Sequence, residues 1–473
     1  MSMFVIREVV EITGGRLMSG CPTTPVRRVW TDSRTTRLGD FFVALTGERF
    51  DGHRFVADAL TKGAVGALVR RGFNKDGMGG KTALPGSAEW PGTAVLIEVD
   101  EPLRGYQDLA RAHRVRFAGP VIAVSGSNGK TTTKEMIGRI VSQRFNTLIT
   151  EGNLNNHIGV PQTLLRITAR HEAVVAEMGI SELGEMARLC AIAAPTHGVL
   201  TNIGPTHLTT LGTVQNVARA KGEMLEALPR DGTAILNADD AFFGELSKLV
   251  RGRVISFGYA AGADVRALHF ESRSPSLVRV RIAARDRTRP FSVRLGVSGR
   301  HNVANALAAT ATGIALGIGI KAIQAGLSRY RPFAMRSEVR QWRGVTLLND
   351  CYNANPASVR AALTWLHDMK RGGRTFAVLG DMLELGREAG KAHREIGQAL
   401  AHTGIDYVLT TGALGAEIGV GALEGGMRAD NVVMAQDPET LAERLRDLVR
   451  RGDVVLLKGS RGARMERVLE ALQ

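Results

Sequence analysis

The sequence predicts an α/β protein made of three domains with parallel sheets. Its 473 residues are more than one ordinary hydrophobic core holds together, and at roughly 150 residues per domain they suggest about three domains. One apolar run, residues 121–124, leads straight into a glycine turn and then into residues that can open a helix. Beyond about residue 329, apolar runs alternate with helical stretches in the βαβ rhythm of a parallel sheet. We therefore predict domains at 1–118, 119–328 and 329–473.

The composition is that of a soluble globular protein, with 44% hydrophobic and 23% charged residues. Charged residues interrupt the first eight positions, and the run 306–320 holds too few large apolar side chains to span a membrane. Three cysteines without a C-x-x-C pair indicate a reducing cytoplasm rather than a disulfide framework or a zinc site. We expect a monomeric cytoplasmic protein without a membrane span.

The net charge of +15 raises the hypothesis that the protein binds nucleic acid. Much of the excess lies in 251–300, where eleven arginines accompany three acidic residues. Arginine alternates with apolar residues over 278–282, so these arginines share one face of a predicted strand. Base stacking on single-stranded nucleic acid needs interleaved aromatic residues, and only 5% of the chain is aromatic. We interpret the arginines as a solvated basic face, expect no nucleic-acid partner, and take anionic substrates as a further reason for positive potential.

Residues 1–118 predict a small α/β domain. A helix near 5–13 is followed by strands at 40–45 and 63–69, with an amphipathic helix at 54–62 between the strands. Residues 72–93, rich in Gly, Lys and Pro, have the composition of a surface loop.

The glycine turn after residue 124 has the motif Gly126-Ser127-Asn128-Gly129-Lys130-Thr131. Its glycines allow a close approach that a Cβ atom would forbid, so backbone N–H groups and the helix N-terminus can face an anion together. Lys130 adds a mobile positive charge for terminal phosphates, and the Thr131 hydroxyl is placed to bind Mg²⁺. The loop is shorter than G-x-x-x-x-G-K-[ST], and a plain Gly-Ser turn with a surface lysine is the alternative. The order of strand, glycines, Lys-Thr and helix favours a nucleoside triphosphate site that includes the following Thr132.

Further polar groups follow in the central domain. Residues 151–161 form a compact cluster of amides and glycines, and Glu177 ends a buried run, where an open parallel sheet places ligand groups such as a Mg²⁺ carboxylate. Taken singly, Glu177 could be a surface residue, His207 a hydrogen-bonding loop residue and Lys221 a solvated helix residue. Asn302 lies near the start of a helix of small residues, where either a helix cap or a contact to a base fits.

The third domain shows four apolar runs that predict parallel strands. These runs are 345–350, 375–379, 407–411 and 454–457. Polar clusters follow three of them, at 350–356, 380–386 and 458–460. Turn chemistry alone explains any single cluster, but three polar strand ends in one domain suggest a face that meets a ligand.

These motifs resemble the Mur ligases, a family that builds the peptide of the bacterial cell-wall precursor. The short phosphate loop, Glu177-Met-Gly, His207 with Lys221 downstream, and Gly299-Arg-His-Asn302 are similar to the ATP site that the family shares. The resemblance extends from about residue 30 to about residue 466. The sequence departs from the family pattern at Thr206 before His207, at Met335 before Arg336 and at His157. These departures affect the local geometry rather than the groups that the reaction needs.

The resemblance implies a P-loop-type ATPase domain between an N-terminal UDP-sugar-binding domain and a C-terminal Rossmann-like ligase domain. The motifs at 152–156, 350–356 and 379–386 look like those of the ligases that join D-alanyl-D-alanine to UDP-N-acetylmuramoyl-tripeptide. The implied reaction consumes ATP, passes through an acyl phosphate and releases ADP. The implied cofactors are two Mg²⁺ ions, with Lys221 carbamylated by CO₂. The C-terminal domain is then expected to close over the site about a hinge near 325–335.

The resemblance also implies roles for individual residues. The catalytic residues would be Lys130, Glu177, His207 and Lys221. The metal ligands would be Thr131, Glu177, His207 and Lys221. Asn302 would contact adenine, Arg336 a phosphate and Asp350 the ribose. The substrates would be held by Ser33, Arg34, Asp51 and His53 at the UDP-sugar, by Asn153, Asn155 and Asn156 near the peptide, and by Tyr352, Asn353 and Asn355 near the dipeptide.

Three alternative functions stay open from the sequence. A related ligase that adds diaminopimelate or lysine, or glutamate to folate, would keep the ATP site and change the C-terminal pocket. At the position of the Asn353-Ala354-Asn355-Pro356 motif, such relatives usually carry an arginine signature that binds a free carboxylate. A nucleic-acid-stimulated P-loop ATPase and a non-catalytic binding module are the alternatives from other functional classes.

Overall fold

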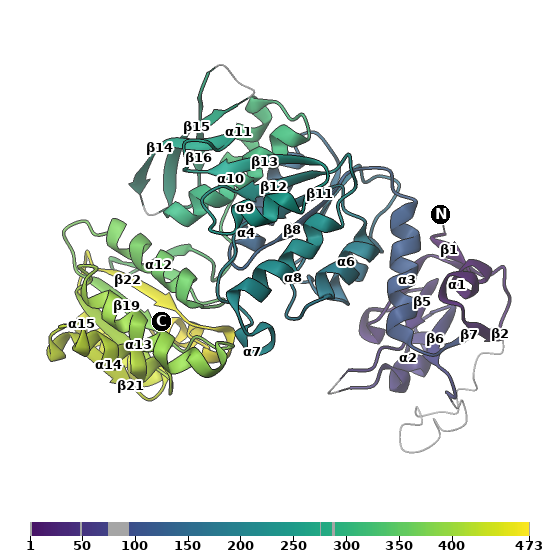
Figure 1. Cartoon of the computed structure of the whole chain (residues 1–473). Helices are drawn as coiled ribbons and strands as arrows, with labels where there is room; N and C mark the ends of the chain where they lie inside the picture. The colour runs from purple at the N-terminus through teal and green to yellow at the C-terminus, as the bar shows by residue number, and fades with distance from the viewer. Residues whose placement is uncertain (1, 48–49, 74–93, 275, 286–288, 473) are drawn as a thin grey trace.

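The computed structural model describes residues 2–47, 50–73, 94–274, 276–285 and 289–472. Across these residues the strands form a five-stranded N-terminal sheet, a nine-stranded central sheet and a six-stranded C-terminal sheet, with one further two-stranded pair. Each of the three larger sheets forms the centre of one domain, and the chain passes through the domains in order (Figure 1). The predicted α/β class with three domains is confirmed.

The N-terminal domain has short strands and a long third helix that leads into the central domain (Figure 1). Its strands are β1 (Phe4–Val5), β2 (Arg16–Ser19), β3 (Pro25–Val26), β4 (Arg28–Trp30), β5 (Asp40–Val43), β6 (Gly66–Arg70) and β7 (Val95–Val99). Its helices are α1 (Ile6–Thr13), α2 (Val56–Thr61) and α3 (Pro102–Val115). The N-terminal sheet has the order β2-β7-β6-β5-β4, with β4 to β7 parallel and β2 antiparallel at the edge.

The predicted helix at 54–62 is shorter in the structure. The Asp51 carboxylate accepts the backbone N–H of His53, so the chain first forms a 3₁₀ turn at Gly52–Phe55, and α2 follows it. Most of the predicted surface loop at 72–93 lies outside the described residues.

The central domain contains the longest sheet, with helices on both of its faces. Its strands are β8 (Val121–Ser125), β9 (Thr147–Ile149), β10 (Ala173–Glu177), β11 (His197–Leu200), β12 (Thr233–Asn237), β13 (Arg253–Gly258), β14 (Val265–Ser274), β15 (Leu277–Ala284) and β16 (Phe291–Leu295). Its helices are α4 (Lys130–Val141), α5 (Gly159–Leu164), α6 (Glu185–Ala193), α7 (Leu208–Leu211), α8 (Val214–Glu226), α9 (Phe243–Lys248), α10 (Arg300–Ala315) and α11 (Ile320–Ser328). The strand order is β16-β15-β14-β13-β12-β11-β8-β10-β9, parallel from β9 to β14 and antiparallel over the last three.

The register of the central strands aligns their carboxyl ends. Strand β8 is buried along its whole length, and it lies between β10 and β11. Glu177 pairs with Val124, and Leu200 pairs with Ser125, so three strands end at the same level of the sheet. The residues that follow these strands therefore lie side by side, at the edge where open parallel sheets place ligands.

The predicted basic strand face is confirmed on β15. Val278, Val280 and Ile282 are buried, while Arg279 and Arg281 between them are exposed. The two-residue period of a strand places the apolar residues on the domain core and the arginines in solvent.

The C-terminal domain has a mostly parallel sheet covered by helices. Its strands are β17 (Glu338–Trp342), β18 (Val345–Asp350), β19 (Thr375–Leu379), β20 (Tyr407–Thr411), β21 (Val432–Ala435) and β22 (Val454–Lys458). Its helices are α12 (Pro356–Asp368), α13 (Ala389–Ala401), α14 (Gly415–Glu424), α15 (Pro438–Leu448) and α16 (Glu466–Leu472). The order is β17-β18-β22-β19-β20-β21, with β17 antiparallel. All four predicted strands are present, and Lys458 pairs with both Asp350 and Leu379, so their polar ends meet.

The C-terminal domain packs against the central domain through α12, which faces α10 (Figure 1). Trp365 of α12 is fully buried, and its Nε1–H donates to the Ser298 hydroxyl oxygen at 2.6 Å. In the connecting segment, Met335 and Ser337 have φ angles of 60° and 50°, a backbone region that costs energy for residues with a Cβ atom. The predicted hinge near 325–335 adjoins this strained segment, and it stays a prediction. No helix among the described residues has the length and apolar composition that a membrane crossing requires.

Candidate active site

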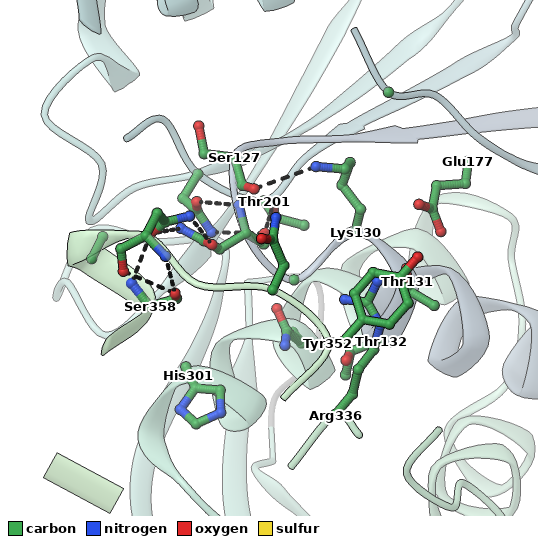
Figure 2. A pocket seen from close by; sticks show the side chains of 18 of the residues that line it. Ser127, Lys130, Thr131, Thr132, Glu177, Thr201, His301, Arg336, Tyr352 and Ser358 are labelled. Atoms are coloured by element: carbon green, nitrogen blue, oxygen red, sulfur yellow. Dashed lines mark hydrogen bonds between the residues drawn. The ribbon is translucent and has the colours of Figure 1, made fainter. Parts of the chain in front are cut away.

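A cavity of about 620 Å³ lies between the central and C-terminal domains, at the carboxyl ends of the central strands. Residues from both domains line it, and Figure 2 shows Lys130 and Glu177 from one side with Arg336 and Tyr352 from the other. The sequence-predicted residues that line the cavity are Ser127, Asn128, Gly129, Lys130, Thr131, Thr132, Asn153, Asn155, Asn156, Glu177, His207, Asn302, Arg336, Asp350, Tyr352, Asn353 and Asn355.

The phosphate-loop glycines occupy positions that no other residue fits. Gly126 has a φ of 141°, and a Cβ atom there would lie 1.9 Å from the Thr201 hydroxyl oxygen. Gly129 has a φ of 81°, and its Cβ atom would lie 2.4 Å from the Asn305 amide oxygen. Gly129 is the N-cap of α4, and no side chain of the described residues caps that helix. The first N–H groups of α4 are therefore free to bind an anion.

The loop is also held from outside by β11 and the residues after it. The Thr201 hydroxyl and the Asn202 amide both donate to the Asn128 carbonyl, at 2.5 and 3.0 Å. The Asn202 side-chain oxygen accepts the Asn128 N–H at 3.0 Å. These bonds hold the loop backbone in one conformation before any ligand arrives, which reduces the ordering cost of binding.

Lys130 is turned back onto its own loop. Its ammonium donates to the Gly126 carbonyl at 2.8 Å and to the Ser127 carbonyl at 3.3 Å, and Figure 2 shows the bond to Ser127. Burial lowers the pKa of Lys130, against the opposing effect of the Glu177 carboxylate and with a further lowering by Arg336. A multiply charged anion in the cavity would compete with these carbonyls for the ammonium and stabilise its charged form.

Glu177 is buried at the end of β10 with one oxygen free. Its Oε1 accepts the Asn155 amide at 2.8 Å. Its Oε2 finds no hydrogen-bond partner among the described residues, although it lines the cavity and lies 3.8 Å from the Lys134 ammonium. A buried carboxylate oxygen without a donor fits a hard cation, and with the Thr131 hydroxyl it forms a donor set that Mg²⁺ accepts. The described residues contain no group of three or more His, Cys, Asp or Glu side chains that could hold a metal ion by themselves, so a metal here would need ligands from phosphate and water.

Lys221 lies in α8, and His207 is the N-cap of the preceding helix, α7. Lys221 is fully buried in α8, so the interpretation as a solvated helix residue is wrong. Burial, and secondarily the charge of Lys130, holds the pKa of the Lys221 amine well below its ordinary range. His207 Nδ1 lies 2.9 Å from Glu384 Oε2 of the C-terminal domain, which leaves Nε2 for a ligand. The hydrogen bond with His207 lowers the pKa of Glu384.

Asn302 does not cap its helix. Gly299 is the N-cap of α10, and Asn302 lies in the first turn, where its Nδ2 donates to the Ser298 carbonyl at 2.8 Å. The cap interpretation is therefore wrong, and the buried amide faces the cavity instead.

The C-terminal domain contributes two ordered groups. The Arg336 guanidinium lies 3.7 Å from the centre of the Tyr352 ring, a cation–π contact. Asp350 pairs with Lys458 at 2.5 Å and accepts the Ser337 N–H at 2.9 Å.

An amide pair joins the two domains across the cavity. Asn355, the N-cap of α12, donates its amide to Asn128 at 2.7 Å, and Asn128 donates back at 3.3 Å. The phosphate loop is thus linked directly to the first turn of α12.

Comparison with known proteins identifies the family. The model of the Mur ligase middle domain matches residues 124–313, and that of the Mur ligase glutamate ligase domain matches residues 335–461. The chain belongs to the Mur ligase family. The UDP-N-acetylmuramoyl-tripeptide–D-alanyl-D-alanine ligase of Escherichia coli is 36% identical over 473 residues, which cover 99% of this chain and 98% of that protein.

Solved Mur ligases have the same architecture. MurF from Acinetobacter baumannii superposes with a TM-score of 0.87 at 32% identity, over 99% of this chain and 98% of that one. MurF from Thermotoga maritima, solved in complex with ADP, superposes with a TM-score of 0.80 at 30% identity, over 94% and 97% of the two chains.

Four predicted site residues of this Mur ligase lie in the N-terminal domain, away from the cavity, whose lining begins at Ser127. Arg34 is 85% exposed and pairs with Asp32, while Ser33 is buried. Both ring nitrogens of His53 are engaged, by the Asp51 carboxylate at 2.6 Å and by the Arg70 N–H at 2.9 Å. His53 therefore shapes its turn, and the ring itself is not free to bind.

Sequence reasoning missed several groups of the Mur ligase site. Lys458 stood out as a polar strand end, but its pairing with Asp350 depends on strand register. Thr201 and Asn202 follow β11 as polar residues, and that signal could have identified them. Lys134 offered no signal beyond its place in a helix.

Proposed function

We propose that this Mur ligase joins D-alanyl-D-alanine to UDP-N-acetylmuramoyl-tripeptide with the conversion of ATP to ADP and phosphate. One observation carries the proposal: a single cavity contains the phosphate loop, the buried Glu177 carboxylate and the amides of Asn353 and Asn355. The full-length relatives bear the name of this activity. The cytoplasm, where ATP and UDP-linked precursors occur, is the proposed location, and the monomer is the proposed form.

The first step activates a carboxylate. The terminal carboxylate oxygen of the tripeptide attacks the γ-phosphorus of ATP, the bond to the bridging oxygen breaks, and ADP leaves. The protein contributes positioning and charge neutralisation, because phosphoryl transfer needs little covalent chemistry from the enzyme. The N–H groups of α4 and the Lys130 ammonium would hold the β and γ phosphates. Arg336, stacked on Tyr352, would neutralise phosphate charge from the other domain.

The second step forms the peptide bond. The free amine of D-alanyl-D-alanine attacks the acyl carbon, phosphate leaves with the bonding electrons, and the amine loses one proton. Tyr352, Asn353 and Asn355 line the cavity from the segment that connects β18 to α12, and we assign them to the dipeptide. Asn153, Asn155 and Asn156 would contact the tripeptide end, and the turns around Ser33, Arg34, Asp51 and His53 would hold the UDP-sugar.

The donor set for Mg²⁺ is Thr131 and Glu177 at one position, and His207 and Lys221 at a second. When bound, Mg²⁺ would neutralise phosphate charge and polarise the phosphoryl group. Lys221 would serve only after carbamylation, because an ammonium repels a cation and a carbamate supplies oxygen ligands. Asn302 would contact adenine. Asp350 would contact the ribose after its ion pair with Lys458 has opened.

Release of ADP across a panel of substrates tests the proposed function. UDP-muramoyl dipeptide and tripeptide are each combined with D-alanyl-D-alanine, diaminopimelate, lysine or glutamate, and a folate with glutamate is added. We expect ADP release and a new pentapeptide with the tripeptide and D-alanyl-D-alanine. Release with the dipeptide and a single amino acid, or with folate and glutamate, would instead identify one of the related ligases.

Substitution of Gly126 by Ala should weaken ADP binding at least tenfold. The added Cβ atom would overlap the Thr201 hydroxyl, and alanine is strained at a φ of 141°, so the loop must move away from its anion-binding conformation. Isothermal titration with ADP measures the effect. Gly244→Ala is the control, because its Cβ atom has open space around it. Equal affinity in both variants would contradict this account of the loop.

Substitution of Glu384 by Gln should raise KM for D-alanyl-D-alanine by less than about fivefold, with kcat nearly unchanged. The pair with His207 links the C-terminal domain to the central domain, but Glu384 is 61% exposed, and exposed pairs contribute about 0–1 kcal/mol. Steady-state kinetics with varied dipeptide measures the change. A hundredfold loss of kcat would show that Glu384 takes part in the chemistry.

A further inference from the structure

Lys134 is a buried cation that the proposed mechanism does not use. It lies in α4 one turn after Lys130, and its side chain is completely buried. Residues four apart lie on the same face of a helix, so the helix that starts at the phosphate loop carries two lysines toward the same region. A buried ammonium needs partners, and those of Lys134 show what it does.

The ammonium of Lys134 holds a loop that we call the amide loop, residues 150–156. It donates to the Thr150 carbonyl at 2.8 Å and to the Gly152 carbonyl at 3.2 Å, and it lies 3.0 Å from Glu135 Oε1. These three contacts match the three N–H donors of an ammonium group. Lys134 therefore fixes the backbone on both sides of residue 151.

The amide loop in turn holds Glu177. Asn155 donates its amide to Glu177 Oε1 at 2.8 Å, and its carbonyl accepts the Gly179 N–H at 2.8 Å. The Thr150 hydroxyl accepts the backbone N–H of Glu177 at 3.0 Å. The Lys134 ammonium itself lies 3.8 Å from Oε2, close enough to offset charge and too far to occupy that oxygen with a hydrogen bond.

We propose that Lys134 is a positioning residue that couples the substrate-binding amide loop to the Glu177 carboxylate of the ATP site. The inference rests on the proposed function for the identity of the substrate, because Asn153, Asn155 and Asn156 are assigned there to the UDP-linked tripeptide. The structural part is independent of it: one ammonium holds the loop, and the loop holds the carboxylate. The phosphate loop has separate supports in Thr201 and Asn202, so ADP binding does not depend on Lys134.

The test compares Lys134→Met with Arg139→Met in the full-length protein. Arg139 is an exposed cation on the same helix, so its replacement controls for the loss of one charge from α4. Lys134→Gln is the second variant, since its shorter side chain keeps an N–H donor group and lowers the risk that the protein fails to fold. Hydrogen exchange of the peptides that cover 126–133 and 150–156 is measured beside the KM values for tripeptide and ATP.

Lys134→Met should accelerate amide exchange at 150–156 at least tenfold, while exchange at 126–133 and affinity for ADP stay within about twofold. KM for the tripeptide should rise at least tenfold, and kcat should fall because Glu177 loses its orientation. Arg139→Met should match the wild type. Wild-type exchange and KM values in Lys134→Met would overturn the inference, and so would faster exchange throughout the central domain. If the wild type itself forms no pentapeptide, the proposed function fails, whereas the exchange data still decide the coupling.

Discussion

Replacement of Lys130 by Met is expected to lower kcat/KM for pentapeptide formation at least about a thousandfold. The transferred phosphoryl group carries negative charge at its equatorial oxygens, and the Lys130 ammonium is the mobile cation of the phosphate loop. The ammonium donates to two carbonyls of its own loop. An incoming phosphate can take the place of these carbonyls without breaking a contact outside the loop. Methionine keeps the length and apolar volume of the side chain but removes the charge. Initial rates of ADP release and of pentapeptide formation measure the loss.

The Lys130 variant should keep its fold, because a partly buried charge for which the described residues provide no ion pair contributes little to stability. Its urea midpoint should therefore equal or exceed that of the wild type. Arg139→Met on the same helix serves as the control for charge loss and should retain full activity. A Lys130→Met enzyme within tenfold of the wild type would refute the assignment of the triphosphate to this loop.

Replacement of Lys221 by Met is expected to lower kcat by about a thousandfold as well, for a different reason. Burial, and secondarily the charge of Lys130, lowers the pKa of this amine and so favours its neutral form, which is the form that can attack CO₂. Nζ would form a bond to the carbon of CO₂ and release one proton, so a neutral group becomes an anion. The loss of that anion would remove one oxygen donor from the second metal position. A loss of this size is comparable to the removal of one preorganised charge from a phosphoryl-transfer site.

The modification itself can be observed directly. After equilibration with ¹³C-bicarbonate, the wild type should show a carbamate carbon resonance that Lys221→Met lacks. Lys221→Arg, which keeps a permanent positive charge, should be as inactive as the methionine variant. Full activity of Lys221→Met, or the same resonance in both proteins, would exclude a carbamylated Lys221 from the mechanism.

Features that depend on neighbouring residues were predicted well. The phosphate loop was recognised because its glycines, Lys130 and Thr131 are contiguous with one buried strand and one helix. The central strands of the C-terminal sheet were located because buried parallel strands are continuous apolar runs that end at turns. Strands β17 and β21 were missed because they lie at the two sheet edges, where partly exposed strands mix polar and apolar residues.

Features that depend on distant residues were predicted poorly. Taken singly, Lys221 fits a solvated helix residue, and only the family resemblance implies a role for it; packing buries it, because its surroundings come from other elements of the central domain. For Asn302 the sequence allows a cap or a contact to a base, and the cap position is taken by Gly299. The meeting of Asp350 with Lys458 follows from strand register, and the contact of Asn128 with Asn355 follows from domain packing. Neither contact can be predicted from the spacing of residues along the sequence.

The amino-acid order alone therefore establishes the α/β class, the glycine turn between β8 and α4 and the chemical character of each strand end, because these follow from backbone conformation and apolar periodicity over a few residues. The folded chain alone establishes which strand ends share a cavity, which lysines are buried and which carboxylate oxygen is left without a donor. Burial and partner distances arise from contacts between residues that are far apart in the chain, and such contacts form only when the sheets and domains have packed.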